Sequence, residues 1–364
     1  MSKLSFGRAI LSVIVTTSVL LTSACTAAPA ATATTSAVSP ETTAPAASAV
    51  TPADTSAPAD TTAAGEKAQI RIAALKGPTG IGLVNLMAAQ DEGTASNDYT
   101  FSLSGSPDDI VAQLSSGQVD IAALPTNLAA VLYQKTNQSI QMLAVNTLGV
   151  LYILENGDDI QTMADLSGDE ILATGQGSVP EYVLNDLLAA SNLEEPATIT
   201  YKAEHAELAT LAASGKADIV MLPEPFVTTV LSKNPDMRIA LDLTEQWQEV
   251  HGGSSASELA MGCLVVTKAF AQANPDALAS FMAEYEVSAE QVNSDPAAAG
   301  KLVAQYQIMA DAALAEKAIP NCHIVMIQGA EMQSIMDPFL AILMEANPKS
   351  IGGKLPDAGF YWIP

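Results

Sequence analysis

Short apolar runs alternate with amphipathic segments along residues 69–241. Apolar residues that alternate or cluster over roughly four to eight positions predict strands, and apolar residues that recur at helical spacing predict helices. The predicted strands are 69–75, 100–103, 119–124, 140–146, 150–154, 170–174, 198–201, 218–222 and 238–241. The predicted helices between them are 80–90, 107–116, 127–133, 163–166, 180–191, 204–213 and 226–231. This alternation predicts βαβ units with mainly parallel pairing.

The pattern changes in the last third of the chain. One more apolar strand is predicted at 259–267, followed by helices at 268–273, 275–293, 296–309, 311–317 and 330–346. Because no third set of strands is predicted for these helices to cover, we expect them to pack back on the first lobe, which contains the predicted strands from 69 to 146.

One segment occurs twice. LSSGQVDIAALPTNLAAVL at 114–132 is similar to LAASGKADIVMLPEPFVTTVL at 211–231. At matched spacing, Gly117, Asp120, Ile121, Leu124 and Pro125 recur as Gly215, Asp218, Ile219, Leu222 and Pro223. In both copies a helix ends at a glycine, an apolar strand follows, and a proline ends the strand where another helix begins. A repeat of this length predicts two similar lobes.

The repeat and the element order together predict an α/β fold of two Rossmann-like lobes joined by a two-strand hinge. Lobe 1 is expected to comprise residues 67–148 and 260–364, and lobe 2 residues 149–259. The chain would cross between the lobes near 146–150 and again near 254–262.

The N-terminal residues predict export. Lys3 and Arg8 precede an uncharged apolar run at 9–21 that is too short to span a bilayer, so residues 1–24 are interpreted as a signal peptide. The small residues before Cys25 resemble a bacterial lipobox, in which that cysteine is lipidated; Thr22 departs from the usual Leu. An ordinary cleaved signal with an incidental cysteine is the alternative. Residues 25–66 are almost wholly Ala, Thr, Pro and Ser, which predicts a disordered tether to a membrane.

Charge and cysteine content exclude several classes of function. The chain has 15 Lys and Arg against 40 Asp and Glu, a net charge of −25, which argues against nucleic-acid binding. Its three histidines are far apart in sequence, so no metal site is predicted. With Cys25 lipidated, Cys263 and Cys322 remain, and they form either a disulfide or two buried free thiols.

Four loops that follow predicted strands are expected to converge at a ligand site. They are 77–80, 124–127, 175–178 and 223–226, and in open α/β sheets ligands bind at such carboxyl ends of strands. The glycines there allow close backbone approach, and helix N-termini favour negative groups. The first loop fits neither a P-loop nor GxGxxG, so no cofactor is predicted. Ser178 lies outside a GxSxG elbow, and no catalytic residue is predicted.

The run DLSGDEILATGQGSVPEYVLNDLL at 165–188, with LAASGKADIVMLPEPF after it, resembles a known family. It is similar to the substrate-binding lipoproteins of ABC importers in the nitrate, sulfonate, taurine and thiamine-pyrimidine group, which have the type II periplasmic binding protein fold. The resemblance covers nearly all of 69–364. By position it implies ligand contacts at Thr79, Gly80, Pro125, Asn127, Asn146, Thr147, Gln176, Gly177, Ser178 and Glu224.

The resemblance implies a monomeric extracytoplasmic protein, anchored to the bacterial cell membrane by a lipidated Cys25, that is not an enzyme. It would trap a small organic solute between its lobes by hinge closure and deliver it to the ABC permease subunits. A sulfonate, a pyrimidine or another small organic molecule remains open, although no Arg occurs in the proposed pocket loops and Lys76 is the only cation near them. The alternative is an enzyme on the same fold that acts on a pyrimidine or menaquinone precursor.

Overall fold

The computed structural model describes residues 67–252 and 258–363. The chain divides into two units, Met1–Thr61 and Thr62–Pro364, and every described residue belongs to the second. The proposed signal peptide, Cys25 and the linker at 25–66 lie outside the described residues, as does part of the predicted second crossing at 254–262.

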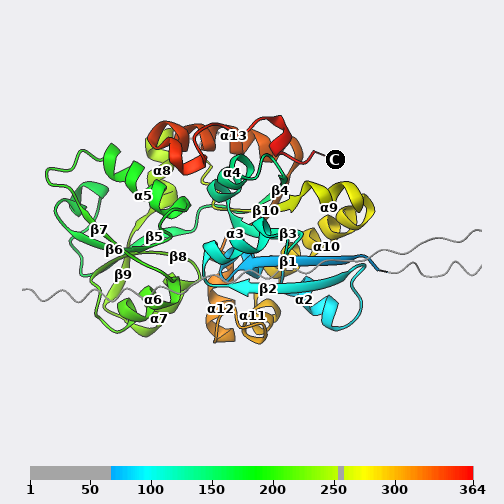
Figure 1. Cartoon of the computed structure of the whole chain (residues 1–364). Helices are drawn as coiled ribbons and strands as arrows, with labels where there is room; N and C mark the ends of the chain where they lie inside the picture. The colour runs from blue at the N-terminus through cyan, green and yellow to red at the C-terminus, as the bar shows by residue number, and fades with distance from the viewer. Residues whose placement is uncertain (1–66, 253–257, 364) are drawn as a thin grey trace, which may run out of the picture. The chain divides into compact units, whose positions relative to one another are not determined.

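Two separate mixed sheets form the framework, as the repeat predicts (Figure 1). The six-stranded sheet has the order β11-β4-β10-β3-β1-β2, and we call this sheet and its helices lobe 1. Its strands are β1 (Gln69–Leu75), β2 (Asp98–Ser104), β3 (Ile121–Pro125), β4 (Ile140–Thr147), β10 (Gly262–Thr267) and β11 (Ile324–Gln328). The five-stranded sheet, in lobe 2, has the order β7-β6-β8-β5-β9. Its strands are β5 (Leu151–Asn156), β6 (Glu170–Thr174), β7 (Thr198–Lys202), β8 (Ile219–Pro223) and β9 (Met237–Asp242).

Helices cover both sheets (Figure 1). Those of lobe 1 before the first crossing are α1 (Pro78–Ile81), α2 (Val84–Asp91), α3 (Pro107–Ser115) and α4 (Thr126–Lys135). Lobe 2 contains η1 (Met163–Leu166), α5 (Val179–Ala190), α6 (His205–Ala213), α7 (Phe226–Lys233) and α8 (Leu243–His251). The C-terminal part contains α9 (Lys268–Ala273), α10 (Pro275–Ser294), α11 (Pro296–Gln305), α12 (Ala312–Ala318), η3 (Ile319–Asn321), α13 (Gly329–Ala346), η4 (Pro348–Ile351) and η5 (Ala358–Phe360).

The two copies of the repeat occupy equivalent places in the two sheets. β3 and β8 each follow a helix that ends at a glycine with positive φ, +70° at Gly117 and +66° at Gly215. Such a φ is accessible to glycine without the steric cost that a Cβ would impose, so glycine suits both turns. The repeated prolines, Pro125 and Pro223, are the last residues of β3 and β8. The repeat therefore encodes one strand and two helix boundaries in each lobe.

The expectation of mainly parallel pairing is wrong. β1 pairs in parallel with β2 and β3, and β6 with β7 and β8, but β10 is antiparallel to β3 and β4, and β5 is antiparallel to β8 and β9. β5 and β10 are the strands by which the chain enters each lobe from the other. They start at the end of the sheet where the βαβ strands stop, so they must run in the opposite direction.

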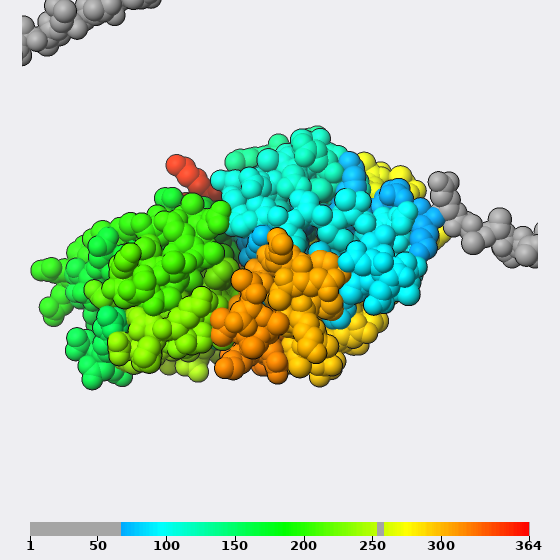
Figure 2. Space-filling view, turned by 90° about the horizontal axis from the view of Figure 1, so that it is seen from below, coloured from blue at the N-terminus to red at the C-terminus, as the bar shows by residue number. Residues whose placement is uncertain are grey.

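From the sequence, the C-terminal helices were expected to pack on lobe 1. In the structure they also contact lobe 2. On α13, Phe339 packs against Trp247 of α8 in lobe 2, with 5.8 Å between ring centroids. One apolar cluster accordingly includes buried residues of both lobes. α12 contacts α7 of lobe 2, and Figure 2 shows the orange surface of lobe 1 against the green surface of lobe 2. Strand β11 and helix α8 were not predicted; β11 extends the lobe 1 sheet beside β4.

Candidate functional site

A cavity of about 420 Å³ lies between the lobes. This volume is within the range of small-molecule sites, which is roughly 300–1,000 Å³. Lobe 1 contributes residues at or after the ends of β1, β2 and β3, and lobe 2 contributes residues at or after the ends of β6, β7 and β8. The carboxyl ends of these six strands meet at the cavity, where open α/β folds bind their ligands.

Prolines begin several of the helices that point toward this cavity. Pro78, Pro107 and Pro180 occupy the first or second position of α1, α3 and α5, and all three line the cavity. A proline at this position has the φ that the first helical turn requires, but it supplies no N–H. The local sequence therefore fixes where the helices start and reduces the number of backbone donors that they offer to a ligand.

Six of the ten predicted ligand contacts line the cavity. They are Thr79, Pro125, Thr147, Gln176, Gly177 and Ser178. All three hydroxyls among them already have partners. Ser178 Oγ donates to Gly175 O at 2.8 Å, Thr79 Oγ1 to Leu75 O at 3.2 Å, and Thr147 Oγ1 to Asn146 Oδ1 at 3.2 Å. Each hydroxyl oxygen can still accept a hydrogen bond.

Gly80, Asn127, Asn146 and Glu224 are not among the lining residues. Gly80 is packed so closely that a Cβ there would lie 2.6 Å from the carbonyl oxygen of Leu75. Asn146 lies behind the wall and its Nδ2 donates to Thr79 O at 3.5 Å. The structure places both residues in the support of the cavity rather than on its surface.

Asn127 connects the lobes. Its Nδ2 donates to Gly177 O in lobe 2 at 3.2 Å and to Ser350 O in lobe 1 at 3.0 Å. The side chain is buried. In this structure Asn127 therefore bridges two carbonyls across the lobe boundary instead of facing the cavity.

Glu224 is also buried between the lobes. Its carboxylate accepts hydrogen bonds from the backbone N–H of Thr228 at 3.0 Å and from Thr228 Oγ1 at 2.9 Å, and Asn321 of lobe 1 adds a side-chain hydrogen bond. Burial raises the pKa of Glu224, and the hydrogen bonds oppose this shift. The carboxylate thus caps the start of α7 and contacts the facing lobe.

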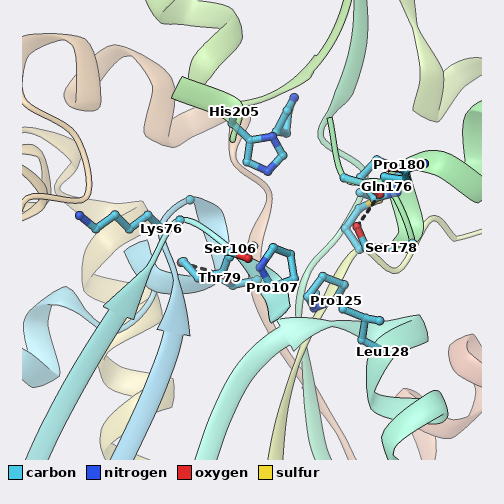
Figure 3. Close-up of a pocket in the computed structure, with 18 of the residues that line it drawn as sticks. Lys76, Thr79, Ser106, Pro107, Pro125, Leu128, Gln176, Ser178, Pro180 and His205 are labelled. Atoms are coloured by element: carbon cyan, nitrogen blue, oxygen red, sulfur yellow. Dashed lines mark hydrogen bonds between the residues drawn. The ribbon is translucent and has the colours of Figure 1, made fainter. Parts of the chain in front are cut away.

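Several lining residues of lobe 2, above all Tyr201 and His205, were not predicted from the sequence. Both residues lie close to the carboxyl end of β7, Tyr201 within the strand and His205 at the start of α6. The expectation that ligands bind at the carboxyl ends of strands could therefore have identified them. From the sequence, the histidines were predicted neither to hold a metal nor to activate Ser178, and no ligand contact was predicted for them. Figure 3 shows the His205 ring in the cavity, directed toward Ser106 and Pro107 of lobe 1.

The charged groups on the cavity wall are few. Among the residues that the structure describes, Lys76, Lys202 and Asp108 line it, and no Arg does. The Lys76 side chain extends away from the centre of the cavity in Figure 3. Much of the remaining wall is apolar, including Leu128 and Met261. The cavity therefore suits a small organic molecule with a limited number of polar groups.

Cys263 and Cys322 are buried free thiols, not a disulfide. Each donates to a backbone carbonyl, Cys263 to Leu124 O and Cys322 to Ala318 O, and they belong to different apolar clusters. Within residues 67–252 and 258–363 there is no group of three or more His, Cys, Asp or Glu side chains arranged to hold a metal ion. Across the same residues, no helix combines the length and hydropathy that a membrane span requires.

Comparisons with known proteins agree with the fold. A family model described as NMT1/THI5 like matches residues 105–299, which is more than half of the chain. A search of curated protein sequences found no match.

Solved structures of an ABC transporter and of two sulfonate-binding proteins are similar over most of the chain. An ABC transporter from Parabacteroides distasonis is 25% identical, with a TM-score of 0.67 over 82% of this chain and 99% of its own. The alkanesulfonate-binding protein SsuA from Xanthomonas axonopodis pv. citri, bound to MOPS, is 20% identical, with a TM-score of 0.59 over 78% and 94%. The periplasmic aliphatic sulphonate-binding protein SsuA from Escherichia coli is 14% identical, with a TM-score of 0.62 over 81% and 92%. The chain thus shares the type II periplasmic binding protein fold.

Proposed function

Since the chain belongs to the NMT1/THI5-like family, we propose that it is the solute-binding lipoprotein of an ABC importer. It binds a small organic solute between its lobes and presents the closed form to the permease subunits in the membrane. The cavity of about 420 Å³ between the lobes, lined from both sides, is the observation that carries this proposal. Its structural neighbours are binding components rather than enzymes, which agrees with the absence of any predicted catalytic residue.

Binding would be coupled to closure because the wall is divided between the lobes. Thr79, Pro125 and Thr147 belong to lobe 1, and Gln176 and Ser178 to lobe 2. A solute that bonds both groups gains its full contacts only when the cleft is closed, so it shifts the population toward that state. The proposed lobes are 67–148 plus 260–364 and 149–259.

The solute is proposed to be a sulfonate, a pyrimidine or another small organic molecule. Capture from a metabolite extract tests this: the purified protein is incubated with the extract, washed and denatured, and the released compounds are identified by mass spectrometry. We expect one compound to be enriched, to raise the Tm and to reduce the radius of gyration in X-ray scattering. Failure of every compound to do any of these would refute the solute-binding proposal.

Anchoring at Cys25 is a separate part of the proposal. A protein lipidated at this residue would be extracytoplasmic, attached to the cell membrane, and monomeric in detergent extracts. We expect the Cys25→Ser variant to be released from the membrane fraction while still binding the solute. A variant that stays in the membrane fraction would contradict lipidation and leave the binding role intact.

A further inference from the structure

The structure assigns a selecting role in lobe 2 to His205, which was not among the predicted contacts. His205 is the first residue of α6, and its Nδ1 lies 2.6 Å from Oγ1 of Thr174, the last residue of β6. The Phe226 ring packs beside the imidazole, with 5.2 Å between centroids. These contacts fix the imidazole while it faces the cavity (Figure 3).

The hydroxyl of Thr174 determines the tautomer. Thr174 is buried, with 1% of its surface exposed, and within the described residues its hydroxyl bonds only His205 Nδ1. If Nδ1 carried the proton, the buried hydroxyl would have no acceptor for its own hydrogen, which is costly. If the hydroxyl donates to Nδ1, its own hydrogen has an acceptor, and the proton of the neutral imidazole is on Nε2. The pairing therefore leaves an N–H for the cavity.

The imidazole remains uncharged at neutral pH. Burial lowers the pKa of His205 to about 4. Glu204 is its neighbour in the chain, and Lys202 on β7 and Asp108 on α3 line the same cavity. Among the described residues, none of the three forms a hydrogen bond or an ion pair with the ring. His205 is therefore a neutral donor rather than a cation.

Tyr201 supplies a second polar group on the same wall. Its Oη is buried and has no hydrogen-bond partner within the described residues, and the residue lines the cavity. A buried hydroxyl without a partner costs free energy that a ligand atom can recover. Tyr201 is in β7 and His205 begins α6, and both residues line the cavity.

We propose that Thr174 fixes His205 as the neutral Nε2–H tautomer, and that His205 with Tyr201 selects solutes by donating to an acceptor group without an ion pair. The acceptor would be a carbonyl, sulfonyl or ring-nitrogen lone pair. Thr174 is a positioning residue, and His205 and Tyr201 are the contacts. This inference rests on the proposed function, because it names the chemistry by which the same cavity recognises its solute.

Nitrogen-15 NMR of histidine-labelled protein tests the tautomer without any solute. The chain has three histidines, and a His205→Gln spectrum identifies the signals of His205. At pH 6 we expect a protonated Nε2 and an unprotonated Nδ1, with proton uptake only near pH 4. An imidazolium at pH 6, or a proton on Nδ1, would overturn the proposal.

Capture from the metabolite extract tests selection. We expect His205→Leu and Thr174→Val to retain about tenfold less solute per protein than wild type, and His205→Gln and Thr174→Ser to restore much of it. Tyr201→Phe should reduce retention less. Circular dichroism checks that each variant is folded. If His205→Leu does not fold, the comparison of Thr174→Val with Thr174→Ser decides the test. Undiminished capture by the folded Leu and Val variants overturns this inference alone. Absence of capture and compaction in wild type refutes the binding role, and the selecting role with it.

Discussion

Replacement of Asn127 by alanine distinguishes a residue that joins the lobes from one that contacts solute. Asn127 donates to Gly177 O of lobe 2 and to Ser350 O of lobe 1, and alanine removes both bonds. A net intramolecular hydrogen bond contributes about 0.5–1.5 kcal/mol, so we expect a loss of about 1–3 kcal/mol in the free energy of unfolding. Only the bond to Gly177 joins lobe 1 to lobe 2 and so favours closure. The loss of this one bond, about 0.5–1.5 kcal/mol, would shift the equilibrium between closed and open forms roughly two- to tenfold toward the open form.

Urea denaturation measures the loss of stability, and X-ray scattering measures the opening of the cleft. Asn293→Ala is the matched control, because Asn293 Nδ2 donates to Ile324 O at 2.8 Å within lobe 1. The control should lose about 0.5–1.5 kcal/mol without a change in the separation of the lobes. Unchanged stability and scattering of Asn127→Ala, with weaker solute capture alone, would show that the side chain acts as a ligand contact and would refute the bridging argument.

Three further variants test other parts of the structure. Trp247→Ala should lower the free energy of unfolding, measured by urea denaturation, by about 3–5 kcal/mol because the ring is fully buried between the lobes. Val250 on the same helix is 45% exposed, so the control Val250→Ala should change it by less than about 0.5 kcal/mol. Equal effects would contradict the packing account. In Gly262→Ala the new methyl would lie 2.4 Å from Thr79 Cγ2, so we expect the free energy of unfolding to fall by about 1–3 kcal/mol. Solute capture should also weaken, because Gly262 and Thr79 line the cavity. Unaltered capture would show that this part of the cavity wall adapts to the methyl group. Because the pKa of His205 is about 4 when folded and about 6.5 when unfolded, the unfolded chain binds more protons between these values, and stability should fall as the pH falls from about 6.5 to about 4. His205→Gln should lose this part of the pH dependence in urea titrations, and an identical profile would contradict it.

Much of the fold could be predicted because it depends on local patterns. The glycines at 117 and 215 and the prolines at 125 and 223 fix where helices and strands end, and these constraints act within a few residues. The predicted strands and most helices are confirmed to within a few residues. β11 was missed because a short apolar run does not by itself distinguish a strand from part of a helix.

The candidate site was predictable only in part. The rule of strand carboxyl ends located the loops that contain Thr79, Pro125 and Ser178, which line the cavity. It could not show that Glu224, in an equivalent loop, folds back onto Thr228. Whether a side chain at a strand end faces the cavity or the neighbouring lobe depends on the packing of the facing loop, which is distant in sequence.

The sequence alone determined a duplicated α/β plan and an acidic composition, and it predicted an export signal and a ligand site at the loop ends, because periodicity, glycine and proline positions and composition act locally or additively. The tertiary structure decided which strands run antiparallel, that α13 joins the two lobes, that Asn127 bridges them, and that Thr174 orients His205. Each of these depends on contacts between residues far apart in the chain, and such contacts exist only once both lobes have folded and met.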